Sequence, residues 1–81
     1  MSIDHLLTTP VEIYRDGKKI LETKAQVQEG TIFFKNADVK QLDIIKVIST
    51  QDEFEVVNHP YKQIHPRTNE VLYIEAKVRK S

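Results

Sequence analysis

The sequence predicts an all-β single domain over residues 1–81, a small antiparallel barrel or sandwich of about six short strands. Apolar and polar residues alternate with a period of two in several short runs, as they do in a strand with one buried face. Turn signals separate these runs, among them Asp16-Gly17 and Glu29-Gly30. Closure into a barrel is favoured at this length because it removes the open edges of a sheet.

The first two strands are expected to form a hairpin. Residues 11–14 alternate between apolar and polar side chains, and residues 21–28 do so over a longer run. Asp16-Gly17 lies between the two runs, and both of these residues tolerate the positive φ that a two-residue hairpin turn requires. Pairing of the two runs follows.

Four further strands are expected at residues 31–36, 43–49, 53–58 and 71–79, where β-branched and aromatic residues gather. Alternation over nine residues favours a strand over a helix for the last of them. Residues 2–7 could add one helical turn, with Ser2 as its N-cap. The predicted core consists of the inward-facing residues Val11, Ile13, Leu21, Ala25, Val27, Ile32, Phe34, Ile45, Val47, Phe54, Val56, Leu72, Ile74, Ala76 and Val78.

The composition of the chain bears on its class of partner and on its location. The chain has 12 basic and 12 acidic residues and a net charge of zero, whereas proteins that neutralise phosphates usually carry a basic excess. It has no cysteine, which fits a reducing cytoplasm. Its start has no signal-peptide pattern, and no stretch reaches the ~18 apolar residues of a membrane helix, so we expect a soluble protein.

Neither catalysis nor a metal site has a signature. No serine lies in a glycine-rich elbow, and two glycines are too few for a phosphate-binding loop. His59 and His65 are six residues apart, a spacing that no common zinc motif uses, although two prolines could bring them together with Asp52 or Glu70. We expect solvated histidines, no cofactor, no metal and no enzyme activity.

Nucleic-acid binding is the alternative function. Tyr14, Phe33 and Tyr73 could stack bases on one face of the sheet, in the manner of an oligonucleotide-binding barrel. Acidic residues among the basic ones would weaken binding of the phosphate backbone. The lysines have another explanation, since they protect strand edges from pairing with other chains. The possible nucleic-acid contacts are Arg15, Lys18, Lys19, Lys24, Lys77 and Arg79.

Residues 59–69 resist the strand pattern. Pro60 and Pro66 cannot donate to a ladder, so the sequence predicts a long, mobile surface loop with a short extended piece at 61–64. Such a loop is suited to become ordered against a partner; the alternative is a lid packed over one barrel end. The expected partner-binding residues are Tyr61, Lys62, Ile64, His65 and Arg67.

Residues 38–45, DVKQLDII, form a corner that leads into a strand. In several small β-barrels a step of the form V-x-x-G-D-x-V/I occupies such a corner, and its acidic residue bonds backbone N–H groups. Asp43 holds the acidic position here, but Leu42 stands in place of the glycine. This turn therefore cannot adopt a positive φ without strain.

The corner and five other segments together resemble the small head-tail joining proteins of tailed bacteriophages, the adaptor and stopper group. These segments are MSIDHLLTTPVEIYR, AQV at 25–27, IFF at 32–34, FEVV at 54–57 and the final YIEAKVRK. The resemblance implies a six-stranded barrel that forms one subunit of a ring at the head-tail connector, with a loop that helps gate the DNA channel. It implies no enzyme activity, and as partners other copies of the chain and phage connector or tail proteins. The expected location is the virion or the cytoplasm of the bacterial host.

Overall fold

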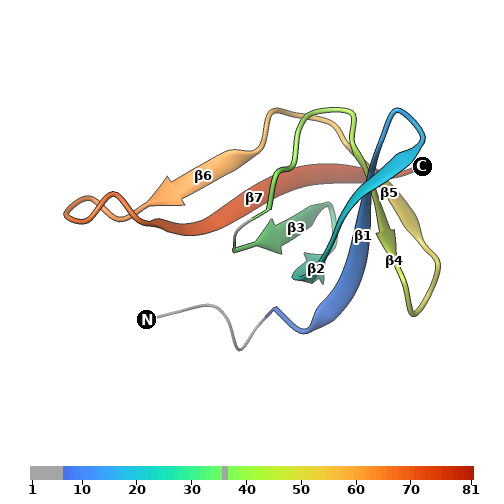
Figure 1. The fold of residues 1–81 in the computed structure, drawn as a ribbon, viewed down its shortest axis with the longest axis horizontal. Helices are drawn as coiled ribbons and strands as arrows, with labels where there is room; N and C mark the ends of the chain where they lie inside the picture. Colours follow the sequence, from blue (N-terminus) through green and yellow to red (C-terminus); the bar gives the residue numbers. More distant parts are fainter. Residues whose placement is uncertain (1–6, 36) are drawn as a thin grey trace.

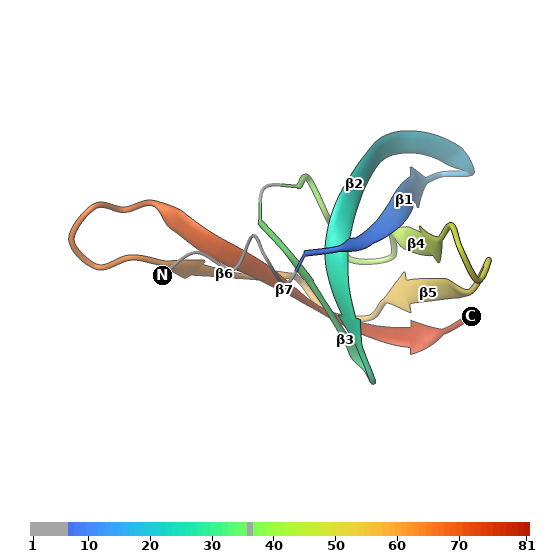
Figure 2. The same ribbon diagram turned by 90° about the horizontal axis from the view of Figure 1, so that it is seen from below.

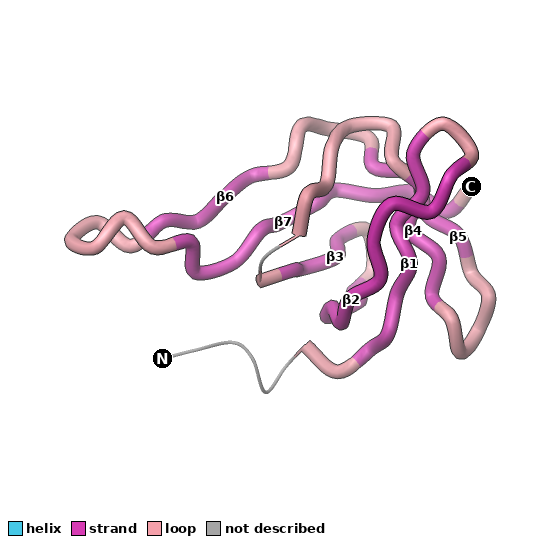
Figure 3. Tube along the Cα trace, viewed as in Figure 1, coloured by secondary structure: helices cyan, strands magenta, loops and turns pink. Residues whose placement is uncertain are grey.

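The computed structural model describes residues 7–35 and 37–81, which form seven strands and no helix (Figures 1 and 3). The all-β prediction is confirmed. No helix in this part of the chain is long and apolar enough to cross a membrane. The helical turn expected at 2–7 lies, apart from Leu7, outside the described residues. The strands are β1 Thr9–Arg15, β2 Lys18–Gln28, β3 Thr31–Phe34, β4 Ile44–Val47, β5 Glu53–Val56, β6 Tyr61–Ile64 and β7 Val71–Lys80.

Six of the strands close an antiparallel barrel in the order β3-β2-β1-β4-β5-β7, and the pairing of β7 with β3 completes the ring. β7 makes closure possible because it is long: residues 74–77 pair with β3 along one edge, and residues 78–80 pair with β5 along the other. A closed barrel leaves none of these six strands with an open edge over its paired length.

The first hairpin has the predicted turn. Arg15 and Lys18 are opposite each other, and Asp16 and Gly17 between them have φ of 54° and 79°. Positive φ at both positions matches the right-handed twist of the strands. The register shifts after Ile13, which leaves Ile20 as an additional residue on β2 with 41% of its surface exposed.

The core follows the predicted alternation with one correction. Eleven of the fifteen predicted residues lie on strands β1 to β5 and are buried or packed against the buried cluster, and Ile74, Ala76 and Val78 on β7 are buried as well. Leu72 is only half-buried, because the register of β6 and β7 shifts next to it and the strand has already left the barrel there. Ala37 and Val39, which lie between β3 and β4, join the core unpredicted.

β6 is the extra strand and pairs only with β7 among the described residues. Tyr61 lies opposite Glu75 and Ile64 opposite Val71. We call β6, the turn 65–70 and residues 71–75 of β7 the arm; Figures 1 and 2 show this hairpin projecting from the barrel. The extended piece predicted at 61–64 coincides with β6, but the expectation of a loop without a regular ladder was wrong: the prolines lie just outside β6, at positions 60 and 66, and do not interrupt its pairing with β7.

Candidate functional site

The corner that leads into β4 is built around a buried carboxylate. Asp43 is 2% exposed and accepts two hydrogen bonds from Arg15, one from Nε and one from a terminal nitrogen, each 2.9 Å long. Its Oδ2 also accepts the Lys40 N–H at 2.9 Å. A bidentate arginine matches the planar carboxylate geometrically, and the third bond saturates it further.

This environment keeps Asp43 ionised. Burial alone would raise the pKa of the carboxyl, but the bonds from Arg15 and from the Lys40 N–H outweigh that effect, and the pKa is lowered. The Arg15 pKa is raised in turn, chiefly by the bond to Asp43. The three bonds join β1, the segment before Leu42 and the start of β4 at one buried carboxylate, so Asp43 fixes the conformation of this corner.

The bonds to Asp43 hold a strained turn at Leu42. The Lys40 carbonyl accepts the Asp43 N–H at 3.1 Å, which closes a turn whose third residue needs a positive φ. Leu42 occupies that position with φ of 76°, and 68% of it is exposed. The Leu42 N–H donates to the Val56 carbonyl at 2.8 Å, so β5 also holds the turn. A residue other than glycine therefore adopts the positive φ at this corner, the conformation that the sequence analysis identified as strained for leucine.

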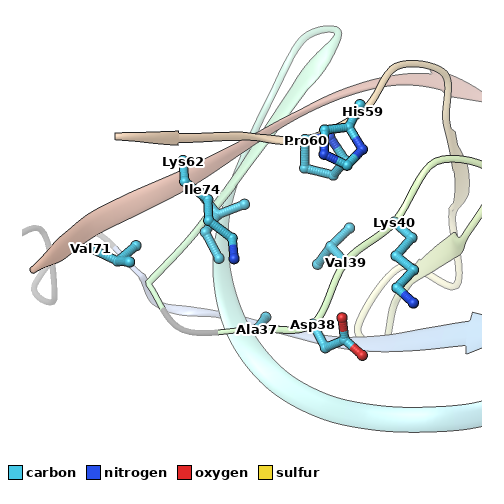
Figure 4. A pocket seen from close by; sticks show the side chains of 9 residues that line it. All are labelled: Ala37, Asp38, Val39, Lys40, His59, Pro60, Lys62, Val71 and Ile74. Atoms are coloured by element: carbon cyan, nitrogen blue, oxygen red, sulfur yellow. The ribbon is translucent and has the colours of Figure 1, made fainter. Parts of the chain in front are cut away.

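The arm presents two faces. Residues directly opposite on an antiparallel pair point to the same side, so Lys62, Ile64, Val71 and Ile74 share one face, which we call the pocket face. It looks onto a cavity of about 350 Å³ between the arm and the segment 37–40 (Figure 4). Ile74, Ala37 and Val39 line its apolar part, while polar side chains such as Lys62 and Asp38 lie at its rim.

The structure brings the predicted partner-binding residues together on the arm. Lys62 and Ile64 lie on the pocket face, and Tyr61 lies on the opposite face, 60% exposed. His65 and Arg67 follow in the turn, where the Arg67 N–H donates to His65 Nδ1 at 3.1 Å. Tyr61 and Ile64 therefore do not form the buried lid that was the alternative.

The two histidines do not converge. His59 precedes β6 and His65 follows it, and the four extended residues between them span roughly 13 Å. His59 lies at the cavity beside Pro60, whereas His65 belongs to the turn at the far end of the arm. In residues 7–35 and 37–81 no three histidine or acidic side chains are grouped so that they could hold a metal ion.

Most of the basic residues of the alternative function are occupied by carboxylates. Arg15 binds Asp43, and Lys19 lies 3.2 Å from both Glu12 and Glu22. The other pairs are Lys77 with Glu75, and Arg79 with Glu55. Lys18 and Lys24 are exposed.

The aromatic residues of this alternative are also engaged within the chain. The Phe33 and Tyr73 rings contact edge to face at 5.7 Å, and the Tyr14 hydroxyl donates to Glu12. Each of the three rings thus has a contact within the chain.

Sequence reasoning missed the Arg15–Asp43 pair and the cavity. Arg15 and Asp43 are 28 residues apart, and no local pattern joins them. The available signal was the unusual position of Asp43, an acidic residue directly before a β-branched run that enters the core. Ala37 and Val39 alternate with Asp38 and Lys40, and this short alternation could have predicted a buried face in the connection.

Comparison of the chain with protein-family models, with curated proteins and with solved structures finds no match.

Proposed function

We propose that this protein is a non-enzymatic structural assembly protein that acts through protein–protein contacts, as a head-tail joining or connector subunit of a bacteriophage or prophage. The arm is the observation that carries the proposal. It projects from a barrel that closes without β6, and it leaves Tyr61, Ile64 and Val71 between 37% and 60% exposed. Apolar and aromatic side chains held outside the core are typical of interfaces.

The corner supports the same proposal. Leu42 is kept exposed on a strained turn by a saturated carboxylate and by a bond to β5. Strain that the surrounding structure enforces is concentrated at functional positions. The start MSIDHLL, the step DVKQLDII and the end YIEAKVRK provide the resemblance that specifies a phage connector among assembly proteins. A zero net charge also allows subunits to associate, because little long-range repulsion separates them.

The genes that flank the coding sequence provide the first test. A connector subunit should be encoded among portal, capsid and tail genes. Deletion of the coding sequence from that phage should then yield DNA-filled heads and free tails that electron microscopy shows unjoined. Flanking genes of metabolism, or intact particles after deletion, would contradict the proposal.

Titration with labelled single-stranded DNA and RNA at two salt concentrations provides a second, independent test. Little binding is expected even at low salt, because the carboxylates described above occupy Arg15, Lys19, Lys77 and Arg79. Micromolar binding that weakens steeply with salt would favour the oligonucleotide-binding function instead.

A further inference from the structure

We infer that the open edge of β6 accepts an extended strand of another protein, one that carries a carboxylate opposite Lys62 and an apolar side chain opposite Ile64. This inference rests on the proposed function in one respect, that the partner is a protein. Two observations together carry it: β6 has an edge that no described residue pairs with, and residues 58–69 around that edge contain no acidic residue.

The backbone of β6 determines which groups are free. The His65 N–H donates to the Glu70 carbonyl at 2.9 Å, so the N–H of residue 65 points toward the strand that leads into β7. Backbone N–H and C=O groups of successive residues point to opposite edges of a strand. Those of Gln63 and Tyr61 therefore face β7, and those of Lys62 and Ile64 face the open edge. Four backbone groups are available there to a further strand, the arrangement that β-augmentation uses.

The prolines limit the length of the added strand. Pro60 and Pro66 hold the next outward-facing positions on either side, and neither has an N–H to donate. A partner strand is thus restricted to the ladder bonds of Lys62 and Ile64. In an antiparallel partner, the residues opposite these two are separated by a single residue, and both point toward the pocket face.

The surroundings specify the two partner side chains. The residue opposite Ile64 lies beside the Ile64 side chain, which is 46% exposed and has Val71, 37% exposed, as its neighbour on β7, so an apolar side chain fits. The residue opposite Lys62 meets an ammonium group that has no ion pair among the described residues. Residues 58–69 contain Lys62 and Arg67 but no aspartate or glutamate, in a chain with 12 acidic residues. A carboxylate therefore complements this edge.

Charge also argues against a second copy of β6 as the occupant. Two copies of β6 could pair in an antiparallel arrangement. The register that keeps both prolines out of the ladder and avoids a Lys62–Lys62 contact has its twofold axis at Gln63. That register places the Lys62 and Arg67 side chains of both copies along one shared edge, and residues 58–69 offer no acidic residue to separate them. Like charges on adjacent strands destabilise the pairing.

Two peptides added to the intact, isotope-labelled chain test the inference by amide NMR. In the first peptide valine and threonine alternate over nine residues, and glutamate replaces the central valine; the second has lysine at that position. The glutamate peptide should shift the Lys62 and Ile64 amides most and bind about threefold to tenfold more tightly than the lysine peptide. Lys62→Glu should reverse this preference, whereas the matched change Lys24→Glu on β2 should leave it intact.

A backbone variant tests the mode of binding separately. Ile64→Pro removes an N–H that points to the open edge and leaves the bonds of β6 to β7 in place, so the barrel resonances should persist while binding of the glutamate peptide is lost. Equal binding of both peptides, or no shift of the β6 amides at millimolar peptide concentration, would contradict the inference that the added strand carries a carboxylate. Shifts of the β6 amides that depend on protein concentration alone would instead identify a second copy as the occupant. None of these results depends on the phage origin, which the flanking genes and the deletion test by themselves.

Discussion

Leu42 holds a backbone conformation that suits glycine, and its side chain gains little from burial because 68% of the residue is exposed. The left-handed conformation costs an L-residue roughly 1–2 kcal/mol. The strain at Leu42 and the exposure of its side chain fit the proposed role of this corner as part of a contact surface.

Leu42→Gly should therefore stabilise the isolated protein by about 0.5–1 kcal/mol, since glycine adopts this φ without strain but also loses more entropy on folding. Leu42→Ala is the matched control: it keeps the strain and removes only exposed atoms, so its free energy of unfolding should stay within about 0.5 kcal/mol of the wild type. Denaturant unfolding measures both. A destabilised glycine variant would show that the leucine side chain supports the fold.

The ionisation of Asp43 makes the free energy of unfolding depend on pH. Its pKa in the folded state lies below its usual value of 3.8, so the folded protein binds fewer protons than the unfolded chain in this range. The stabilisation is complete above roughly pH 5 and is lost as the pH falls through the lowered pKa. Asp43→Asn should reduce the free energy of unfolding by about 1–3 kcal/mol at pH 7, because Arg15 and the Lys40 N–H lose an ionised acceptor.

The difference between Asp43→Asn and wild type should shrink from pH 5 toward pH 2, as the wild-type carboxyl becomes protonated. Asp38→Asn is the control, because Asp38 is 70% exposed and lies 3.4 Å from Arg15; its effect should remain within about 0.5 kcal/mol. Urea unfolding as a function of pH gives these differences. A constant difference for Asp43→Asn at all pH values would show that ionisation of this carboxyl does not contribute.

Truncation of Ile74 and of Leu72 to alanine tests where along β7 the barrel core ends. Ile74 is 3% exposed and belongs to the core cluster, whereas Leu72 is half-buried at the register shift. Ile74→Ala should cost about 2–5 kcal/mol of unfolding free energy, and Leu72→Ala clearly less, because no closed cavity remains at a partly exposed site. Thermal unfolding of the two variants compares them. Equal losses would place Leu72 in the core after all.

At the scale of elements, β6 differs from the other strands because only β7 supports it. Tyr61, Lys62 and Ile64 are exposed, so little apolar burial opposes the opening of this strand. Local opening should therefore release β6 at a lower free energy than unfolding of the barrel requires.

Native-state hydrogen exchange should resolve three groups of amides. Lys62 and Ile64 should exchange fastest, since their N–H groups point to the open edge. Gln63 and His65 should exchange by local opening, at rates that change little with denaturant. The Ile13 amide in β1 should exchange only through global unfolding, so its exchange rate should rise steeply with denaturant. Protection of Lys62 and Ile64 equal to that of Ile13 in the isolated protein would mean that the edge is already covered.

At the scale of the whole molecule, local periodicity predicted the six barrel strands well, because one buried face imposes the same alternation on each strand. It could not predict the pairing of Arg15 with Asp43, which depends on two segments meeting after the chain has closed into a barrel. It also misplaced residues 59–69: the prolines exclude ladder positions at 60 and 66, yet four residues between them are enough for a strand. The half-buried Leu72 departs from the alternation because a bulge is not visible in the sequence pattern.

The molecule as a whole combines a closed barrel with one projecting arm, and its extents are 37 × 23 × 22 Å. Ion pairs do not distinguish the arm from the barrel, because Lys18 and Lys24 on the barrel, like Lys62 and Arg67 on the arm, have no ion pair among the described residues. The arm differs in that it projects from the barrel and holds Tyr61 and Ile64 exposed, and on this ground we propose it as the site of contact with other proteins.

Complementation of a deletion with arm variants tests this central claim most directly. The proposed function predicts that the wild-type copy restores infectious particles to a phage from which the gene has been deleted, and that Lys62→Glu combined with Ile64→Pro does not, although the purified variant unfolds as cooperatively as the wild type. The same number of changes on the barrel surface, Lys24→Glu and Lys18→Gln, should restore infectivity, because both side chains are exposed. Full infectivity with the arm variant would contradict the account, because it would show that the contacts of this protein lie elsewhere.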